Sequence, residues 1–345
     1  MAVAAEKTRS KLRRLTELLT GKVYLLIAMQ DNPDPDSLAA AVALRRLAKS
    51  LGTLQCSIAC GGTVGRGENR ALVKYLDLNL RRYGEIDYGK YDLVAMVDTQ
   101  PGAGNNSLHE GVLPDIVIDH HPIRRRTRTV AFTDVRSGYG ATSTILVEYL
   151  IEAGITPETP LATALLYGIR SDTQDLGREA SRLDIEAIEF LYPLANNRML
   201  GAIQRGKVPR GYYQMLADAL RNARVLGPAI ITELGDIDNP DMIAEVADLL
   251  LRADETSWTM CTGCWDGKLL ISLRTSDESN LAGKVMKHMV GRKGTGGGHP
   301  TYAGGQIPLA KGTKAEREAI EKAVEERFLQ AVGAGHSPVE RLVKV

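Results

Sequence analysis

Residues 23–39 read VYLLIAMQDNPDPDSLA and join a strongly apolar segment directly to a cluster of acidic side chains. The apolar part, residues 23–29, has the composition of a buried strand. Asp31, Asp34 and Asp36 follow within a few positions. Carboxylates this close raise one another's pKa values unless a cation or hydrogen bonds compensate. The stretch therefore predicts a buried strand that ends at a site for positive charge.

Short apolar strands alternate with helical patterns through the first half of the chain. We expect strands at residues 23–29, 54–59, 91–97 and 115–118. Pro33 and Pro35 would keep the chain extended up to Ser37, which would cap a helix over residues 37–51. This alternation predicts an α/β fold with a mostly parallel sheet covered by helices on both faces. Helical patterns then dominate residues 141–192.

The second half predicts a smaller α/β domain. Gly and Pro interrupt the apolar periodicity near residues 201–210, which indicates a linker between a first domain, 1–200, and a second, 211–345, across a cleft. Two strands joined at Asp266-Gly267 would carry Cys261 and Cys264 as structural thiols. A glycine-rich loop, the strand GGQIPL and a final charged helix follow.

Composition excludes several classes of function. The chain has 345 residues, 44% of them hydrophobic and 25% charged, with a formal net charge of +1. No apolar run approaches the ~20 residues of a membrane helix, so we expect a cytoplasmic protein without a membrane partner. With 5% aromatic residues, the chain offers little surface for stacking a long nucleic acid strand, and we expect none to bind.

Three predicted strands end in side chains that can bind metal. QDNPDPD follows the first, Asp98 follows the strand YDLVAMV, and Asp119, His120 and His121 follow DIVI. Ligands of an open α/β sheet bind at the carboxyl ends of its strands. One aspartate there could be an ordinary helix cap, but three successive strand ends indicate a shared site. Carboxylates with one imidazole suit Mn²⁺, Mg²⁺ or Fe²⁺.

Two further details concern the aspartates. Asp34 and Asp36 are one residue apart, which in an extended segment would place both side chains on the same side. Asp172 follows an apolar helix in GIRSDTQDLG, and periodicity alone makes it an ordinary helix end.

The motifs NPDPDS, VDT, DHH and SDT, in this order, resemble the four motifs of the DHH phosphoesterase family. SLRTSDES followed by GTGGGHPTYAGG is similar to the DHH-associated substrate domain of the same family. The resemblance covers nearly the whole chain except the N-terminal helix and the C-terminal tail. It implies a metal-dependent hydrolase, a phosphodiesterase or phosphatase.

The resemblance also implies a ligand set for two divalent ions, usually Mn²⁺, with Mg²⁺ as a substitute. The implied ligands are Asp34, Asp36, Asp98, His120 and Asp172. Asp98 would bridge both ions and, with His120 and His121, form the catalytic set of a two-metal hydrolysis. His121 would face the substrate or orient the ligands, and Asp119 would accept a hydrogen bond behind them.

One position departs from the family pattern. The first motif commonly begins with His two residues before Asn, whereas this chain has Gln30 there, followed by Asp31. A glutamine carbonyl is a weaker ligand than imidazole. One ion would then bind loosely, or Asp31 would replace the missing ligand.

Two further segments could bind phosphate. The resemblance assigns substrate binding in the second domain to Arg274, Gly296, Gly297, Gly298 and His299. An arginine fork matches phosphate geometry, and backbone amides of glycines approach anions closely. Arg124, Arg125, Arg126 and Arg128 form a basic run, which is ordinarily a solvated face, with phosphate steering as the alternative.

Length and layout resemble the branch of the family that degrades very short RNA and dephosphorylates pAp, the 3',5'-bisphosphate of adenosine. Some relatives of that branch cleave cyclic dinucleotides. We therefore expect a hydrolase of short oligonucleotides or small nucleotide phosphates, with a homodimer left open. The alternatives are a nucleotide-binding sensor with a degraded metal site, and a pyrophosphatase-like or exopolyphosphatase-like activity.

Overall fold

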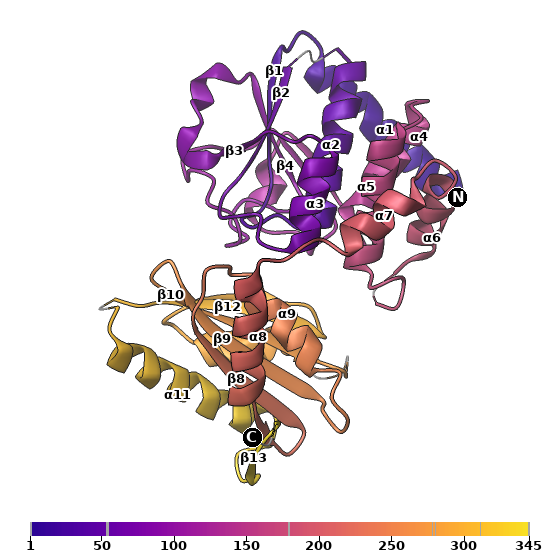
Figure 1. Cartoon of the computed structure of the whole chain (residues 1–345). Coiled ribbons are helices and arrows are strands. Elements are labelled where there is room, and N and C mark those ends of the chain that lie inside the picture. Colours follow the sequence, from indigo (N-terminus) through magenta and orange to yellow (C-terminus); the bar gives the residue numbers. More distant parts are fainter. Residues whose placement is uncertain are drawn as a thin grey trace. The chain divides into compact units, whose positions relative to one another are not determined.

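The buried strand expected at residues 23–29 is β1 (Tyr24–Ala28), an inner strand of a six-stranded parallel sheet. The computed structural model describes residues 2–52, 55–178, 180–277, 279, 281–310 and 312–343. The chain divides into two compact units, Met1–Lys207 and Val208–Val345 (Figure 1). Residues 201–204, which we assigned to a linker, are helical because the side chain of Asn196 caps a helix that continues to Gln204.

The first unit contains six strands and seven α-helices among its described residues. The strands are β1, β2 (Gln55–Cys60), β3 (Leu80–Arg82), β4 (Leu93–Val97), β5 (Ile116–Asp119) and β6 (Phe132–Val135). The helices are α1 (Ala2–Leu19), α2 (Pro35–Ser50), α3 (Gly67–Tyr75), α4 (Thr142–Glu152), α5 (Thr159–Asp172), α6 (Arg182–Leu191) and α7 (Asn197–Gln204). Leu54, the first residue of one expected strand, lies outside the described residues.

The strand order of this sheet places a ligand site beside β1. The order is β3-β2-β1-β4-β5-β6, and every neighbouring pair is parallel. From β1 the chain steps outward through β2 and β3 and then returns, so that β4 pairs with the other side of β1. The order therefore reverses between β1 and β4, the place where open α/β sheets bind ligands. The α/β fold with a mostly parallel sheet is confirmed.

The two faces of the sheet are covered differently. Leu25 and Ile27 point to the face on which α2, α4 and α5 pack, and Leu26 and Ala28 point to the opposite face. The described residues that cover this second face lie in strands, loops and the short 3-10 turns η1 (Tyr83–Glu85) and η2 (Tyr88–Lys90). The expectation of helices on both faces was wrong, because the connections on this side are rich in turn-forming residues such as PGAGNNS.

The helix after β1 begins earlier than expected. Asp34, not Ser37, is its N-cap, and the Asp34 carboxylate accepts a hydrogen bond from the backbone N–H of Ser37. Pro35 occupies the first turn, where its missing N–H costs nothing and its fixed φ suits the helix. Pro35 is thus the first residue of the helix, whereas we expected it to keep the chain extended up to Ser37.

The second unit is built on a seven-stranded mixed sheet in the order β11-β12-β10-β9-β8-β7-β13. Its strands are β7 (Arg224–Leu226), β8 (Ala229–Asp236), β9 (Trp258–Trp265), β10 (Lys268–Thr275), β11 (Thr295–Gly298), β12 (Tyr302–Pro308) and β13 (Val339–Arg341). Its helices are α8 (Arg210–Asn222), α9 (Met242–Leu250), α10 (Ala282–Val290) and α11 (Lys314–Ala331). The hairpin expected at Asp266-Gly267 is present between β9 and β10.

Helices cover both faces of this second sheet. α10 and α11 pack on one face, and α8 and α9 pack on the other. The glycine-rich segment expected to be a loop is strand β11, which pairs antiparallel with β12. Gly296 in this strand has no room for a side chain, because α10 lies so close that a Cβ atom there would stand 2.8 Å from the Met286 side chain.

None of the helices in the described ranges combines the length and the apolarity that a bilayer-spanning helix needs.

Candidate metal centre

The acidic ends of three strands and one helix meet at the carboxyl edge of the first sheet. Asp36 follows β1, Asp98 follows β4, and His120 follows β5, while Asp172 is the last residue of α5. The Nε2 atom of His120 lies 3.1 Å from Asp172 Oδ2 and 3.6 Å from Asp98 Oδ1. One ligand atom from each of Asp36, His120 and Asp172 lies within 4.8 Å of the others. The structure thus brings together residues that are far apart in sequence.

The orientation of the His120 ring is fixed by the nitrogen that points away from the carboxylates. Its Nδ1 lies 3.2 Å from the backbone oxygen of Tyr139. A carbonyl oxygen can only accept, so Nδ1 carries a hydrogen and Nε2 is left to face the carboxylates. The phenol of Tyr139 is in turn held by Arg136 and Glu148.

Asp36 is held by the N-terminus of α4. Its two carboxylate oxygens accept from the backbone N–H groups of Thr142, at 2.7 Å, and Ser143, at 2.8 Å. The first N–H groups of a helix carry partial positive charge and have no partner within the helix. Asp36 lies in the first turn of α2, so our expectation of an extended segment holding it beside Asp34 was wrong.

Asp98 adopts an uncommon backbone conformation. Its φ is +58°, the left-handed region that aspartate and asparagine tolerate better than most residues. The side chain is 1% exposed, and Oδ1 accepts a hydrogen bond of 2.9 Å from the Thr142 hydroxyl. One short segment at the start of α4 therefore supports both Asp36 and Asp98.

Three carboxylates of the cluster are hard to ionise. Burial raises the pKa of Asp36 to about 7, and the charge of Asp172 adds to the rise. Burial also raises the pKa of Asp98 well above its usual range, with the charges of Asp34 and Asp36 as further causes. The pKa of Asp34 is raised by burial and by Asp172. The cluster thus concentrates more negative charge than its surroundings solvate.

The ion pair of His120 and Asp172 shifts both pKa values toward the charged forms. Burial acts to lower the pKa of His120, but the hydrogen bond and charge of Asp172 raise it well above its usual range. Burial acts to raise the pKa of Asp172, yet the hydrogen bond from His120 keeps it low. The proton on His120 therefore offsets part of the negative charge, and a divalent cation would replace it.

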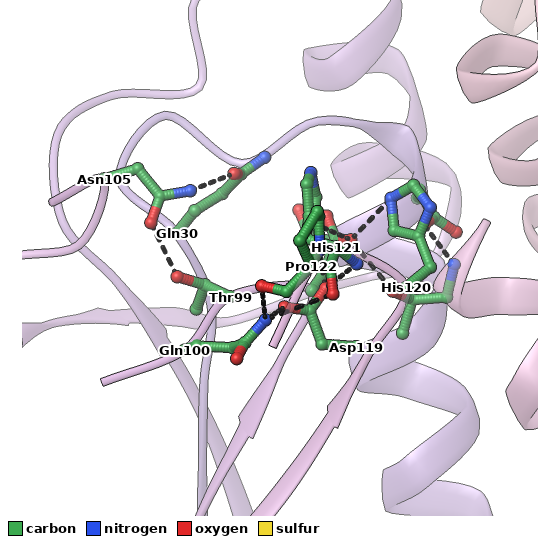
Figure 2. Close-up of polar contacts among 12 residues, drawn as sticks. Gln30, Thr99, Gln100, Asn105, Asp119, His120, His121 and Pro122 are labelled. Carbon is green, nitrogen blue, oxygen red and sulfur yellow. Dashed lines mark hydrogen bonds and ion pairs between the residues drawn. The ribbon is translucent and has the colours of Figure 1, made fainter. Parts of the chain in front are cut away.

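His121 belongs to a second group of contacts (Figure 2). Its Nδ1 lies 2.8 Å from Asp119 Oδ1, and burial acts to raise the pKa of Asp119 while this hydrogen bond and the His121 charge lower it. Gln100 donates to the other oxygen of Asp119 at 2.7 Å, and its own Oε1 accepts from Arg124 N and Thr127 Oγ1. Gln100 thus fixes the segment that carries His121.

Gln30 and Asp31 lie outside the groups of candidate metal ligands and are bonded to other side chains. Gln30 Nε2 donates to Asp34 Oδ2 at 2.8 Å, and its Oε1 accepts from Asn105 (Figure 2). Asp31 Oδ1 accepts from the backbone N–H and the hydroxyl of Ser107. Neither residue joins the clusters of grouped ligand atoms, which among the described residues are Asp36–His120–Asp172 and Asp98–Asp119–His120–His121.

Sequence reasoning missed Gln100, Tyr139, Thr142 and Ser143. The signal for the last two was present, because GATST stands directly before an apolar helix, in the pattern of a helix start. Gln100 follows the VDT motif, yet nothing local shows that its amide reaches Asp119.

The basic run lies immediately after His121. Arg126 and Arg128 belong to the 3-10 turn η3 (Arg126–Thr129), and all four arginines of the run are exposed. Buried Thr127 anchors the turn through its bond to Gln100. Within the part of the chain that the structure describes, these four arginines form no salt bridge, and their charges are exposed to solvent.

In the second unit, Arg274 and His299 lie around Tyr302. The His299 ring stacks on the Tyr302 ring at 4.5 Å between centroids, and the Arg274 guanidinium lies 5.8 Å from the same centroid. Arg274 Nε also bonds to Asp248 Oδ1 at 2.5 Å, so a structural carboxylate already takes part of its fork.

The three glycines before His299 differ in what surrounds them. A Cβ atom at Gly298 would stand 2.2 Å from the backbone oxygen of Tyr302, whereas one at Gly297 would meet only Lys287 Cε at 3.9 Å. Gly298 is therefore needed for the fold, and Gly297 has room for a side chain.

Comparison with known proteins agrees with the geometry. Residues 25–169 match the DHH family, N-terminal domain, and residues 226–329 match the DHHA1 domain. The chain belongs to the DHH family. An uncharacterized protein of Methanocaldococcus jannaschii is 36% identical over 318 residues, which are 90% of this chain and 65% of that protein.

Two other similarities are more distant. A probable manganese-dependent inorganic pyrophosphatase of Bacillus cereus is 29% identical over 149 residues, 43% of this chain and 48% of that protein. The chain thus spans about half to two thirds of the length of these relatives. The crystal structure of an exopolyphosphatase-related protein from Bacteroides fragilis shares the fold, with a TM-score of 0.72, 13% identity, and coverage of 94% of this chain and 98% of that one.

Asp98→Asn tests the electrostatic description of the cluster. Asparagine tolerates the left-handed conformation and can still accept from Thr142, but it carries no charge. Because the raised pKa means that ionised Asp98 costs folding free energy at neutral pH, we expect the metal-free variant to melt higher than wild type, by about 2–4 °C per kcal/mol gained. We also expect the rise in melting temperature with MnCl₂ to be lost. A lower metal-free melting temperature with the MnCl₂ effect intact would contradict the description.

Gly297→Ala and Gly298→Ala form a matched pair that separates packing from substrate binding. We expect Gly298→Ala to lower the melting temperature clearly, because its Cβ collides with backbone, and Gly297→Ala to melt like wild type. Under the substrate-binding role of this segment, Gly297→Ala should raise KM. Equal stability of both variants in thermal denaturation would refute the steric distinction.

Proposed function

We propose that this protein is a divalent-metal-dependent phosphoesterase that hydrolyses short oligonucleotides or small nucleotide phosphates. The observation that carries the proposal is the convergence of Asp36, Asp98, His120 and Asp172 at the switch point of the sheet. Such a cluster of buried carboxylates with one oriented imidazole has little structural benefit, because burial and mutual repulsion make it costly.

The donor set fits manganese or magnesium. Carboxylate oxygens with one imidazole nitrogen suit these ions, whereas the four cysteines lie elsewhere, in β2 and β9. Asp36, Asp98, His120 and Asp172 would hold the ion. A divalent cation bound there would act as a Lewis acid, polarising a phosphate oxygen and making a water molecule more acidic.

The chain's own residues would complete the reaction around that ion. Asp119 accepts from His121 Nδ1, which fixes the orientation of the ring. The other ring nitrogen of His121 would donate a hydrogen bond to a phosphate oxygen or a proton to the departing alkoxide. Arg126 and Arg128, exposed in η3, lie five and seven residues after His121 and would attract the remaining phosphates of the substrate. In the second unit, considered by itself, Arg274 and His299 would form a separate phosphate-binding element, the role that the family resemblance implies for them.

The competing activities differ in what they require. The probable pyrophosphatase of Bacillus cereus supports pyrophosphate as an alternative substrate. The hydrogen bond from Gln30 to Asp34 supports the sensor alternative, because it occupies one candidate metal ligand. We favour hydrolysis because Asp36, Asp98, His120 and Asp172 are all present with their supporting hydrogen bonds.

A hydrolysis panel with MnCl₂ tests the proposal. The substrates are pAp, a 5'-phosphorylated diadenylate, a longer oligoribonucleotide, cyclic di-AMP, pyrophosphate and a linear polyphosphate. We expect turnover of the first two to exceed that of the longer strand. His121→Gln should lower kcat about 100-fold, the scale of a proton-transfer group, without loss of bound manganese.

Asp36→Asn, purified in parallel, controls for contaminating nucleases and should be inactive. Preference for pyrophosphate or polyphosphate would replace the proposed substrate class. Tight binding of a nucleotide without turnover of any of these compounds would establish the sensor instead.

A further inference from the structure

A chain of hydrogen bonds fixes which atom Gln30 presents to Asp34. Asn106 Nδ2 donates to the backbone oxygen of Gln100 and to Thr99 Oγ1, at 3.2 and 2.9 Å. Thr99 Oγ1 then donates to Asn105 Oδ1 at 2.7 Å, and Asn105 Nδ2 donates to Gln30 Oε1 at 2.9 Å. Gln30 Nε2 completes the chain on Asp34 Oδ2 at 2.8 Å. Figure 2 shows the links from Thr99 through Asn105 to Gln30.

The Gln100 carbonyl oxygen can only accept, and so can Asp34 in its ionised form, which is the form that binds a cation; together they set the direction of the chain. The Gln100 carbonyl oxygen requires an N–H from Asn106 at one end, and the Asp34 carboxylate takes an N–H from Gln30 at the other. Reversing one amide would place two oxygens or two N–H groups against each other. The carbonyl of Gln30 is therefore turned to Asn105, and Asp34 receives the amide N–H.

The loop that carries this chain is itself tied to the segment after β1. The backbone N–H of Asp31 donates to the backbone oxygen of Asn105 at 2.8 Å. Asp31 Oδ1 accepts from the backbone N–H and the hydroxyl of Ser107, at 3.0 and 2.8 Å. These bonds hold Asn105 beside Gln30. They also engage one of the two carboxylate oxygens of Asp31.

Asp34 and the rest of the cluster thus differ in what they offer a cation. Asp34 Oδ1 accepts from Ser37 N, and Asp34 Oδ2 accepts from Gln30, so each oxygen already has an N–H donor. Each oxygen of Asp36 also accepts an N–H, so these bonds alone do not exclude a cation. Asp34 differs because Gln30 turns an N–H toward it, which cannot bind a metal, and because Asp34 lies outside the grouped ligand atoms of the described residues.

We propose that this protein binds one divalent ion tightly, at Asp36, Asp98, His120 and Asp172, and that Gln30, locked by Asn105, makes a second position at Asp34 at least about tenfold weaker. The inference rests on the metal centre proposed above. It assigns Gln30 and Asn105 as the residues that set the number of tightly bound ions.

Gln30→Glu is the direct test. The variant keeps the size of the side chain and the acceptor for Asn105, but it replaces the N–H facing Asp34 with a negatively charged oxygen. Two carboxylates facing each other favour a cation between them. In MnCl₂ titrations of the full, EDTA-stripped chain, followed by the electron paramagnetic resonance signal of free Mn²⁺, we expect one tight ion for wild type and two for Gln30→Glu.

The chain offers a matched control and a second variant. Gln214 donates to Asp218, also four residues on, so Gln214→Glu creates a similar carboxylate pair on α8 and should still bind one tight ion. Asn105→Ala unlocks the Gln30 amide without adding charge. We expect it to keep one tight ion and to strengthen the weaker binding several-fold, which keeps the test decisive if Gln30→Glu does not fold.

Four results would overturn the inference. Two equally tight ions in wild type would do so while leaving the proposed function intact, and so would a single tight ion in folded Gln30→Glu. A second ion gained by Gln214→Glu as well would show that the gain is unspecific. Absence of any tight ion in wild type would remove the metal centre and the proposed function together.

Discussion

Concentrated negative charge at the carboxyl edge of one parallel sheet is the constraint on which the first unit depends. The sheet reverses its strand order between β1 and β4, which brings the acids that follow these strands close together. Burial and repulsion raise the pKa values of Asp34, Asp36 and Asp98. Hydrogen-bond donors offset part of this charge. The N-terminus of α4 donates to Asp36, the Thr142 hydroxyl donates to Asp98, and protonated His120 pairs with Asp172.

Part of this arrangement can be read from the sequence, because parallel strands end at the same edge. Asp98 stands directly after one apolar run and His120 two positions after another, so their convergence follows from the strand pattern. Asp172 ends a helix and was placed in the site only by family resemblance. The donors to Asp36 could not be predicted locally, since Thr142 lies 106 residues further along the chain.

Errors in the sequence-based description arose where packing or capping outweighed local pattern. Pro35 starts α2 because Asp34 caps it, and the glycine-rich segment is strand β11 because it pairs with β12, with Gly296 packed against Met286 of α10. The orientation of Gln30 depends on Asn105, Asn106 and the backbone of Gln100. Such a chain of bonds has no signature in the sequence, although the substitution of a glutamine in the first motif does.

Anomalous diffraction at the manganese edge, from crystals of the full chain grown with MnCl₂, tests most directly whether the acidic edge is a metal centre. We expect a strong peak enclosed by Asp36, Asp98, His120 and Asp172, and the same peak should be absent from crystals of Asp98→Asn. A peak elsewhere in the molecule, or no peak at this edge at saturating manganese, would contradict the metal centre and the phosphoesterase function built on it.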